Sequence, residues 1–317
     1  MMSLSYSLNR TAWAIRSLTG SMDTDTAIRE LAKLPYTVAF LDQADSNKPF
    51  IVRVKDYSQQ EFDEFVKARD VIGEQILQYM DLYNMVAIMY DNLAEAYKKR
   101  VEQVEAQGRI NARDDLTELN AYFAALVANF GMYLGCVPDK ISSKRRDILD
   151  AHNKATNVEY DNSFAYRLFC VLRNYTLHHT PPITGIRGSS KVADRPGGVN
   201  VEYEVFIEKD KLMQNRIVAN KLAADFALPT KNYPVIETAN QAMHCLKRIH
   251  WKTIKALLTP IQDEVALIES LAALTAKHNK QPFIAEFLPN KAGQGTDAQL
   301  HLVPVQILDY RSTASKY

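Results

Sequence analysis

The stretch from Gln59 to Gln107 constrains the fold more than any other part of this sequence. Its apolar residues recur every three or four positions, which is the spacing of one face of an α-helix. They are Phe62, Val66, Ile72, Ile76, Met80, Tyr83, Val86, Tyr90, Leu93, Tyr97, Val101 and Val104. We expect one very long helix, or two helices that meet near Gly73 or Asn84. Such length indicates a helical bundle or a partner chain.

The ends of this helix and the positions of the others can also be predicted. Ser58 and Glu61 have the spacing of a capping box, and Gly108 is a typical helix terminator. Further helices are predicted at residues 23–34, 112–134, 142–154, 163–179, 211–226 and 236–278, the last with a break near Pro260.

Strands are few. The sequence NVEYEVFIE, residues 200–208, alternates apolar and polar positions as a half-buried strand does. Weaker candidates lie at 50–54, 283–287 and 300–307, which suggests a small sheet that joins both ends of the chain. The expected fold is mainly α: a helical bundle with long helices plus a small β element, α+β overall. The expected regions are 1–57 with an N-terminal helix and short strands, 58–182 as the bundle, and 183–317 as an α+β region packed on it.

Composition excludes some functions. With 38 basic and 37 acidic residues the formal charge is +1, so no global field draws the chain to nucleic acid or to an anionic membrane. Any contact with a polyanion must use a local patch. Cys136, Cys170 and Cys245 are far apart and show no metal-ligand spacing, which favours reduced thiols in a cytoplasmic protein without structural zinc. The N-terminal segment lacks the pattern of a signal peptide.

One segment, residues 119–138, is uncharged and long enough to raise the question of a membrane span. Gly131 and Gly135 have the spacing that lets transmembrane helices pack closely. Asn120, Asn129 and charged flanks on both sides favour a buried helix of a soluble protein instead. We therefore expect no membrane span.

The stretch GIRGSSKVADRPGGV, residues 185–199, is rich in glycine, serine and basic residues. This composition predicts a mobile loop. A flexible connector to the strand at 200 is one interpretation, and contact of Arg187, Lys191 and Arg195 with phosphate is the other.

The helix before that stretch has two apolar faces. At about 100° per residue, Phe164, Leu168, Val171, Leu172 and Tyr175 form one stripe, which must face the core. Arg167, Asn174 and His178 lie together on its flank, whereas Phe169, Arg173 and Leu177 lie on the far side. The far face needs either another element of this chain or a second copy of it.

Pro181 and Pro182 place His178 and His179 in the last turn of this helix, where the negative helix end favours a protonated imidazole. Two interpretations stay open. The histidines can cap the helix beside a buried arginine. Alternatively, an acid/base histidine and a fixed guanidinium can attack a phosphodiester.

The sequence YRLFCVLRNYTLHHTPPI, with Arg173, Asn174 and His178, resembles the motif of the HEPN superfamily, in which an arginine, a polar residue and a histidine end a bundle helix. Upstream, LNAYFAALVANFGMYL, a basic linker helix and NVEYDNSFAYRLFCVLRNY resemble uncharacterised bacterial HEPN-like proteins. The resemblance covers residues 59–182 and is closest over 115–182.

The resemblance implies a homodimer whose two motif helices meet across a two-fold axis and form a composite, metal-independent ribonuclease site without a cofactor. Such proteins often serve toxin–antitoxin or antiviral defence modules, so the implied partners are RNA and a neutralising or regulatory protein. Carried over by position, Arg173, Asn174 and His178 are the catalytic residues. Further candidates for substrate contact are Arg167, His179, Arg187 and Lys191.

In the implied mechanism the 2′-hydroxyl of RNA is the nucleophile, so the products carry a 2′,3′-cyclic phosphate and a 5′-hydroxyl. His178 moves the proton, Arg173 stabilises the phosphorane and Asn174 orients the phosphate or the imidazole. The alternative is a catalytically inactive helical module that dimerises or binds RNA, nucleotide or a protein. A rival site at His244 and His250 is not expected to hold a metal, because residues six apart on a helix point away from each other.

Overall fold

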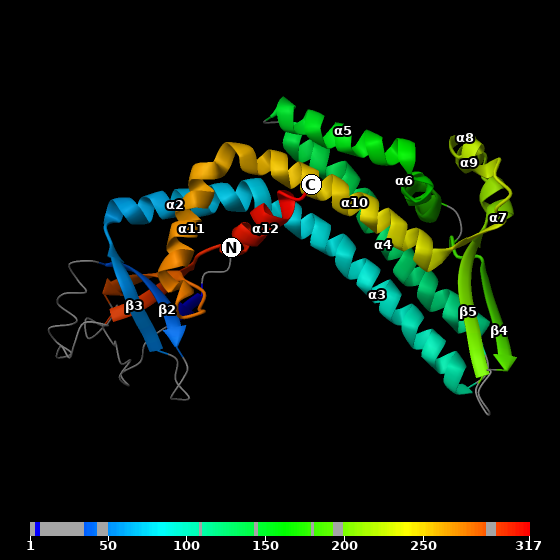
Figure 1. Ribbon diagram of the computed structural model, residues 1–317, viewed down its shortest axis with the longest axis horizontal. Helices are drawn as coiled ribbons and strands as arrows, with labels where there is room; N and C mark the ends of the chain where they lie inside the picture. The colour runs from blue at the N-terminus through cyan, green and yellow to red at the C-terminus, as the bar shows by residue number, and fades with distance from the viewer. Residues whose placement is uncertain are drawn as a thin grey trace. The chain divides into compact units, whose positions relative to one another are not determined.

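A computed structural model describes residues 4–6, 35–42, 50–107, 110–142, 145–178, 181–192, 199–289 and 296–317 (Figure 1). Side chains at 174–178, 189–192 and 199–201, among others, lie outside this description. The chain forms two compact units. The first comprises residues 1–77 and 257–316, and the second comprises residues 78–256 with Tyr317. These units divide the chain differently from the three expected regions, because the first unit joins segments from both ends. The mainly α fold with small antiparallel sheets is confirmed.

The first unit is built on an antiparallel sheet of five strands. Its order is β1 (Leu4–Tyr6), β8 (Thr296–Leu302), β7 (Phe283–Pro289), β2 (Tyr36–Asp42) and β3 (Phe50–Tyr57). One buried cluster of this sheet consists of Ala39, Ile51, Phe283, Ala285, Phe287 and Ala298. The predicted sheet from both ends of the chain is thus confirmed. The predicted strand at 300–307 is wrong beyond Leu302, since Pro304 cannot donate to a ladder and a helix begins at Gln306.

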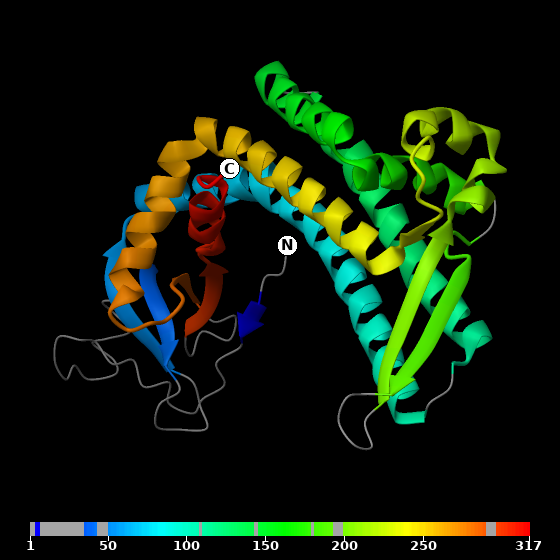
Figure 2. The same ribbon diagram turned by 45° about the vertical axis from the view of Figure 1, so that its right-hand side comes forward.

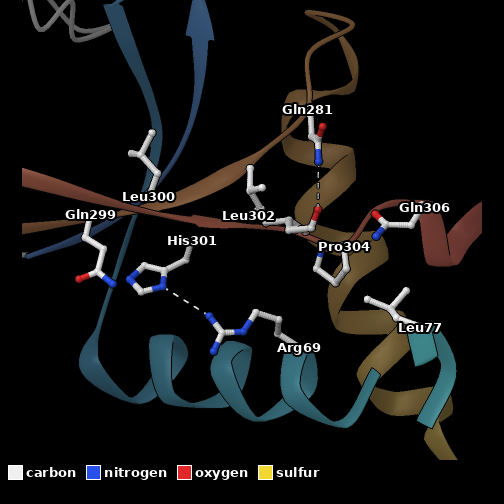
Figure 3. A pocket seen from close by; sticks show the side chains of 10 residues that line it. Arg69, Leu77, Gln281, Gln299, Leu300, His301, Leu302, Pro304 and Gln306 are labelled. Carbon is white, nitrogen blue, oxygen red and sulfur yellow. Dashed lines mark hydrogen bonds between the residues drawn. The ribbon is translucent and has the colours of Figure 1, made fainter. Parts of the chain in front are cut away.

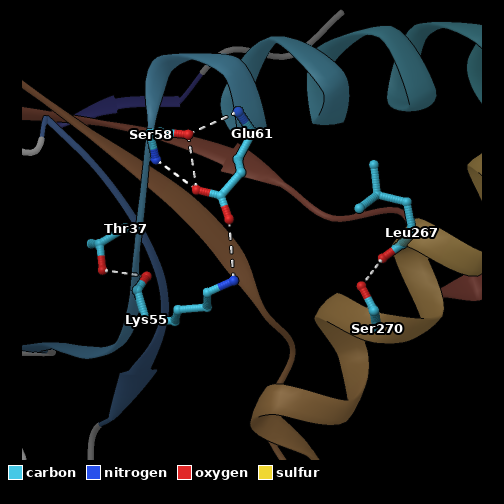
Figure 4. Close-up of polar contacts among 6 residues, drawn as sticks. All are labelled: Thr37, Lys55, Ser58, Glu61, Leu267 and Ser270. Atoms are coloured by element: carbon cyan, nitrogen blue, oxygen red, sulfur yellow. Dashed lines mark hydrogen bonds and ion pairs between the residues drawn. The ribbon is translucent and has the colours of Figure 1, made fainter.

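Helices α2 (Gln59–Ile72), α11 (Gln262–Ala276) and α12 (Gln306–Ala314) complete this unit, and α2 contacts α11. The predicted capping box is confirmed: Glu61 N donates to Ser58 Oγ at 3.2 Å, and Ser58 N donates to Glu61 Oε2 at 2.8 Å (Figure 4). Hydrogen bonds from Ser58, aided by Lys55, lower the pKa of Glu61. The backbone N–H groups of Ser58 and Glu61, which have no carbonyl partner at the start of the helix, are therefore both hydrogen-bonded.

Of the alternatives for the stretch 59–107, the structure shows an interruption at Gly73 in the form of a π-helical turn, η1 (Gly73–Leu77). After it, α3 (Gln78–Gln107) continues without a break at Asn84. The interruption predicted near Pro260 is also confirmed: α10 (Val235–Leu258) is followed by the short 3-10 turn η2 (Thr259–Ile261) and then by α11. Proline lacks the N–H that an uninterrupted helix needs there.

The second unit is a helical bundle. It contains α3, α4 (Ala112–Ser142), α5 (Arg146–Asn162), α6 (Phe164–His178) and α10. Helix α4 contacts α3, α5 and α6. Its fully buried residues are Leu119, Phe123, Leu126, Val127, Phe130, Tyr133 and Val137. Helix α4 therefore supplies the centre of the bundle.

By length and composition, the 112–141 part of α4 is the one helix among the described residues that could cross a membrane. Its most apolar window has a mean hydropathy of 1.4, and 39% of that window is buried. The helix continues eight residues past the predicted end at 134 and includes Pro138. This proline costs one hydrogen bond of the helix, a loss that the packing of Val137 and Ile141 offsets.

A small sheet accompanies the bundle: β4 (Gly185–Val192), β5 (Val199–Glu208) and β6 (Asn232–Pro234). Figure 2 shows the β4–β5 hairpin beside the ends of α3 and α4. The predicted strand at 200–208 is confirmed. The predicted mobile loop is wrong over 185–192, because these residues pair in register with β5. Residues 193–198 lie outside the described part of the chain.

The glycines of β4 allow close contact and do not mark a loop. A Cβ at Gly188 would lie 3.2 Å from Ile110 Cγ1, and one at Gly185 would lie 2.5 Å from Phe206 Cζ. A strand interior with glycine is typical of such close approach.

Two other predicted helices differ in the structure. The helix expected at 211–226 consists of three short ones, α7 (Lys209–Met213), α8 (Arg216–Lys221) and α9 (Ala223–Phe226). Asn215 starts α8, since its side chain accepts hydrogen bonds from the N–H groups of Ile217 and Val218. The helix expected at 142–154 is α5, which begins at Arg146 and ends at Asn162. The helix predicted at 23–34 lies outside the described residues.

Candidate active site

The motif Arg173, Asn174 and His178 lies at the end of α6, as predicted: the helix ends at His178. Just beyond it, Asn120 of α4 fixes the chain. Its Nδ2 donates to the carbonyl of Ile183 at 3.0 Å, and its Oδ1 accepts from the N–H of Ile183 at 2.9 Å. The end of the motif helix is therefore tied to the central helix of the bundle. His179 and the side chains of Asn174 and His178 lie outside the described residues.

The body of α6 is buried on both of its apolar faces. Phe169, from the face that needed a partner, is fully buried, and its ring packs against Phe123 at 5.6 Å and Phe130 at 5.1 Å. Both rings belong to α4. Another element of the same chain thus covers this face at Phe169, so its apolar character no longer argues for a second copy.

Arg173 lies against two glycines of α4. A Cβ on Gly131 would collide with Arg173 Cδ and would lie 2.7 Å from Cγ and 2.9 Å from Nε. A Cβ on Gly135 would lie 3.8 Å from Nη1, an ordinary contact. Gly131 thus provides the space in which the aliphatic part of Arg173 crosses α4.

Arg173 lies at the surface of the bundle. The residue is exposed, and no ion pair joins it to a residue that the structure describes. Its Cγ, Cδ and Nε lie over Gly131 and its Nη1 lies over Gly135, so the side chain runs along the surface of α4, as long cationic side chains often do. An exposed, pre-placed guanidinium suits a phosphate group.

Arg167, a candidate for substrate contact, is engaged within the fold. Its Nε and Nη2 donate to the two carboxylate oxygens of Asp225 at 3.0 and 2.6 Å, and Nη1 donates to the carbonyls of Tyr160 and Asp161. The bonds to Asp225 raise the pKa of Arg167. This pair ties α6 to α9 and the end of α5, so its geometry gives Arg167 a structural role.

Arg187 and Lys191, the candidates from the predicted loop, lie on β4. Arg187 is exposed, lies 3.6 Å from Glu204 and packs over the ring of Phe206 at 5.4 Å. An exposed ion pair of this kind contributes little to stability and leaves the guanidinium accessible. The side chain of Lys191 lies outside the described residues.

A polar cluster fixes the hairpin to the bundle. Tyr203 of β5 donates its hydroxyl to Asp115 at 3.2 Å, and Tyr97 of α3 donates to the carbonyl of Tyr203 at 2.5 Å. Asp115 is buried and pairs with Arg100 at 3.3 Å. Burial and Asp115 both raise the pKa of Tyr203. The strand that carries Arg187 is therefore held through its neighbour β5.

The histidines of α10, His244 and His250, and His152 of α5 are part of the core or of the surface. His250 is fully buried, stacks on Tyr83 at 4.2 Å and lies 3.0 Å from the hydroxyl of Tyr133. His152 is buried with its Nδ1 2.9 Å from Thr253 Oγ1. Burial lowers the pKa of His152 to about 4 and that of His250 to about 3. His244 is exposed.

No three His, Cys, Asp or Glu side chains among the described residues are grouped closely enough to hold a metal ion. Burial raises the pKa of Cys170, next to the motif, to about 11, so its thiol stays protonated.

Comparison with known proteins gives no match to a family model, a curated protein or a solved structure. The functional interpretation therefore depends on the residues of this chain. The sequence had shown the spacing of Gly131 and Gly135 without showing what they accommodate. The glycine pair on one predicted helix and the arginine on another apolar helix were the only signals in the sequence that could have indicated this contact.

Proposed function

We propose that the second unit is a metal-independent endoribonuclease of HEPN type, acting in the cytoplasm in bacterial defence or a toxin–antitoxin module. The observation that carries the proposal is Arg173. It extends from the end of α6 across Gly131 and is exposed, and we infer that its charged group meets a phosphate there. This is the placement required of a group that neutralises charge on a phosphorane.

The proposed reaction uses the 2′-hydroxyl of the substrate. His178, in the last turn of α6, accepts or donates the proton, and the negative helix end favours its cationic form. Asn174 and His178 are four residues apart and share a helix face, which suits Asn174 to orient the imidazole or the phosphate. A homodimer would bring two such helix ends together, and a neutralising protein would cover them.

The test uses purified wild-type protein and the His178→Ala, Arg173→Ala and His244→Ala variants with total RNA in EDTA. His244 is an exposed histidine on α10 and serves as the matched control. We expect wild type and His244→Ala to leave 2′,3′-cyclic phosphate ends, and the two motif variants to lose cleavage.

Cleavage by His178→Ala at the wild-type rate would refute the proposal. RNA binding without cleavage by any of the four proteins would instead support an inactive binding module. In that case Arg173→Ala would weaken RNA binding, since Arg173 would still meet the phosphate.

A further inference from the structure

A cavity in the first unit has the features of a ligand site, and none of its lining residues belongs to the motif of Arg173, Asn174 and His178. Its volume is about 410 Å³, within the range of roughly 300–1,000 Å³ that is usual for small-molecule sites. It lies between α2, η1, β8 and the start of α12 (Figure 3). The lining residues that matter most are Arg69, Leu77, His301, Val303, Pro304 and Gln306.

Among the described residues that line the cavity, Arg69 is the only one with a permanent charge. Its Nε and Nη2 donate to Asp70 Oδ1 at 3.0 and 2.8 Å, and its Nη1 lies 3.4 Å from His301 Nδ1. An arginine carries five N–H bonds, so one on Nη1 and one on Nη2 remain without a partner among the described residues. These two N–H bonds can donate to the oxygens of a carboxylate or phosphate.

His301 holds this arrangement in place. Because arginine only donates, Nδ1 of His301 accepts and its hydrogen is on Nε2, which donates to Glu286 Oε2 at 3.0 Å. The edge contact with Phe62, at 5.1 Å between rings, further limits the imidazole. Figure 3 shows His301 on the side of β8 that faces Arg69, with Leu300 and Leu302 on the opposite side. The carboxylates of Asp70 and Glu286 thus orient the two basic groups without lining the cavity.

The remaining wall combines apolar residues with the amides of Gln281, Gln299 and Gln306, and it includes an uncommon backbone feature. Val303 is fully buried and Pro304 lies next to it, while η1 places Leu77 at the same cavity. A π-helical turn is energetically unfavourable and occurs frequently at functional sites. Gln306 adds an amide at the start of α12.

The geometry points to a binding site for a small organic anion in this cavity. Its carboxylate or phosphate meets the two remaining N–H bonds of Arg69, and its less polar part lies against Leu77, Val303 and Pro304. The weak contact between Arg69 and His301 gives way or is shared when the anion binds.

The experiment is isothermal titration of the full-length protein with octanoate, adenosine 5′-monophosphate and inorganic phosphate. We expect octanoate or the nucleotide to bind with a Kd below about 1 mM, and phosphate alone at least about tenfold more weakly, because it has no apolar part. Octanoate identifies a carboxylate site and the nucleotide a phosphate site. No binding by any of the three overturns the proposal.

Arg69→Gln should weaken binding at least about tenfold. Arg53→Gln is the matched control, because Arg53 pairs with Asp56 in the same unit and does not line the cavity. Equal binding by Arg69→Gln and wild type overturns the proposal.

Two further measurements cover the case in which Arg69→Gln does not fold. Gln306→Trp fills the cavity while it leaves Arg69, Asp70 and His301 in place, and it should abolish binding. In the wild type, the imidazole nitrogen signals of His301 should move as the ligand saturates the protein. Unchanged His301 signals at saturation show that the ligand binds elsewhere and overturn the assignment.

Discussion

Replacing Gly131 by alanine separates the placement of Arg173 from the stability of the fold. The new Cβ would occupy the space of Arg173 Cδ and come within 2.7 Å of Cγ, whereas carbon atoms in contact lie about 3.5–4.0 Å apart. Arg173 is exposed, so its side chain can rotate away into solvent at little cost. The substitution therefore moves the guanidinium and leaves the bundle intact.

Gly131→Ala should raise or preserve the stability of the protein but lower its rate of RNA cleavage. Glycine is less favourable than alanine inside a helix by about 1 kcal/mol, so Gly131→Ala should be as stable as wild type or more stable by up to about that amount. Loss of a group that stabilises the transition state costs about 10²–10³ in rate, and RNA cleavage should fall by a factor of that order.

Gly135→Ala is the matched control, since its Cβ would meet Arg173 Nη1 at an ordinary 3.8 Å. It should gain the same helix propensity and keep cleavage within about threefold of wild type, a change of less than 1 kcal/mol. The assay combines thermal unfolding with the rate of RNA cleavage in EDTA. If Gly131→Ala cleaves as fast as Gly135→Ala, the placement of Arg173 by Gly131 has no functional role and the reasoning is wrong.

Three further predictions concern the fold and the candidate residues. Burial lowers the pKa of His152 from 6.5 to about 4, so the free energy of unfolding is highest above pH 6.5, where this imidazole is neutral, and falls as the pH approaches 4. At pH 5 this histidine alone should lower the free energy of unfolding by about 2 kcal/mol. Equal urea midpoints at pH 8 and pH 5 would contradict this prediction. His152→Gln should remove only about half of that pH dependence, because buried His250, whose pKa is lowered to about 3, contributes a similar loss. Arg167→Ala leaves Asp225 without its partner and should destabilise the protein by about 3 kcal/mol in denaturant titrations. Arg187→Ala removes only an exposed ion pair and should cost less than about 0.5 kcal/mol. Similar losses of stability for the two variants would show that the pair of Arg167 and Asp225 is not structural. Arg187→Ala should slow RNA cleavage only if β4 contributes to the substrate site, which a comparison of its rate with wild type tests directly.

Local patterns predicted much of the helical framework. Ser58 and Glu61 marked the start of α2, and Pro260 marked the break between α10 and α11. Gly73, where the π turn begins, was one of two candidate positions for an interruption. Each of these signals acts through a few neighbouring residues, so the sequence alone is sufficient to read it.

Long-range packing explains what the sequence did not predict. The glycines of β4 resembled a loop until Ile110 and Phe206, which are distant in sequence, showed why small residues are needed there. In the same way, Phe169 has its partner rings on α4, so a face that could have met a second copy is covered within the chain. The position of Arg173 against Gly131 depends on how α4 and α6 pack, which periodicity within one helix does not determine.

The order of segments in the first unit has a consequence for synthesis on the ribosome. Strands β2 and β3 precede the whole second unit, whereas β7 and β8 follow it. The bundle can therefore close while the early hairpin still waits for its partner strands, with β2 exposing a free edge. A nascent chain at that stage is a natural substrate for chaperones, and a stop codon after α10 would release a bundle joined to half of a sheet.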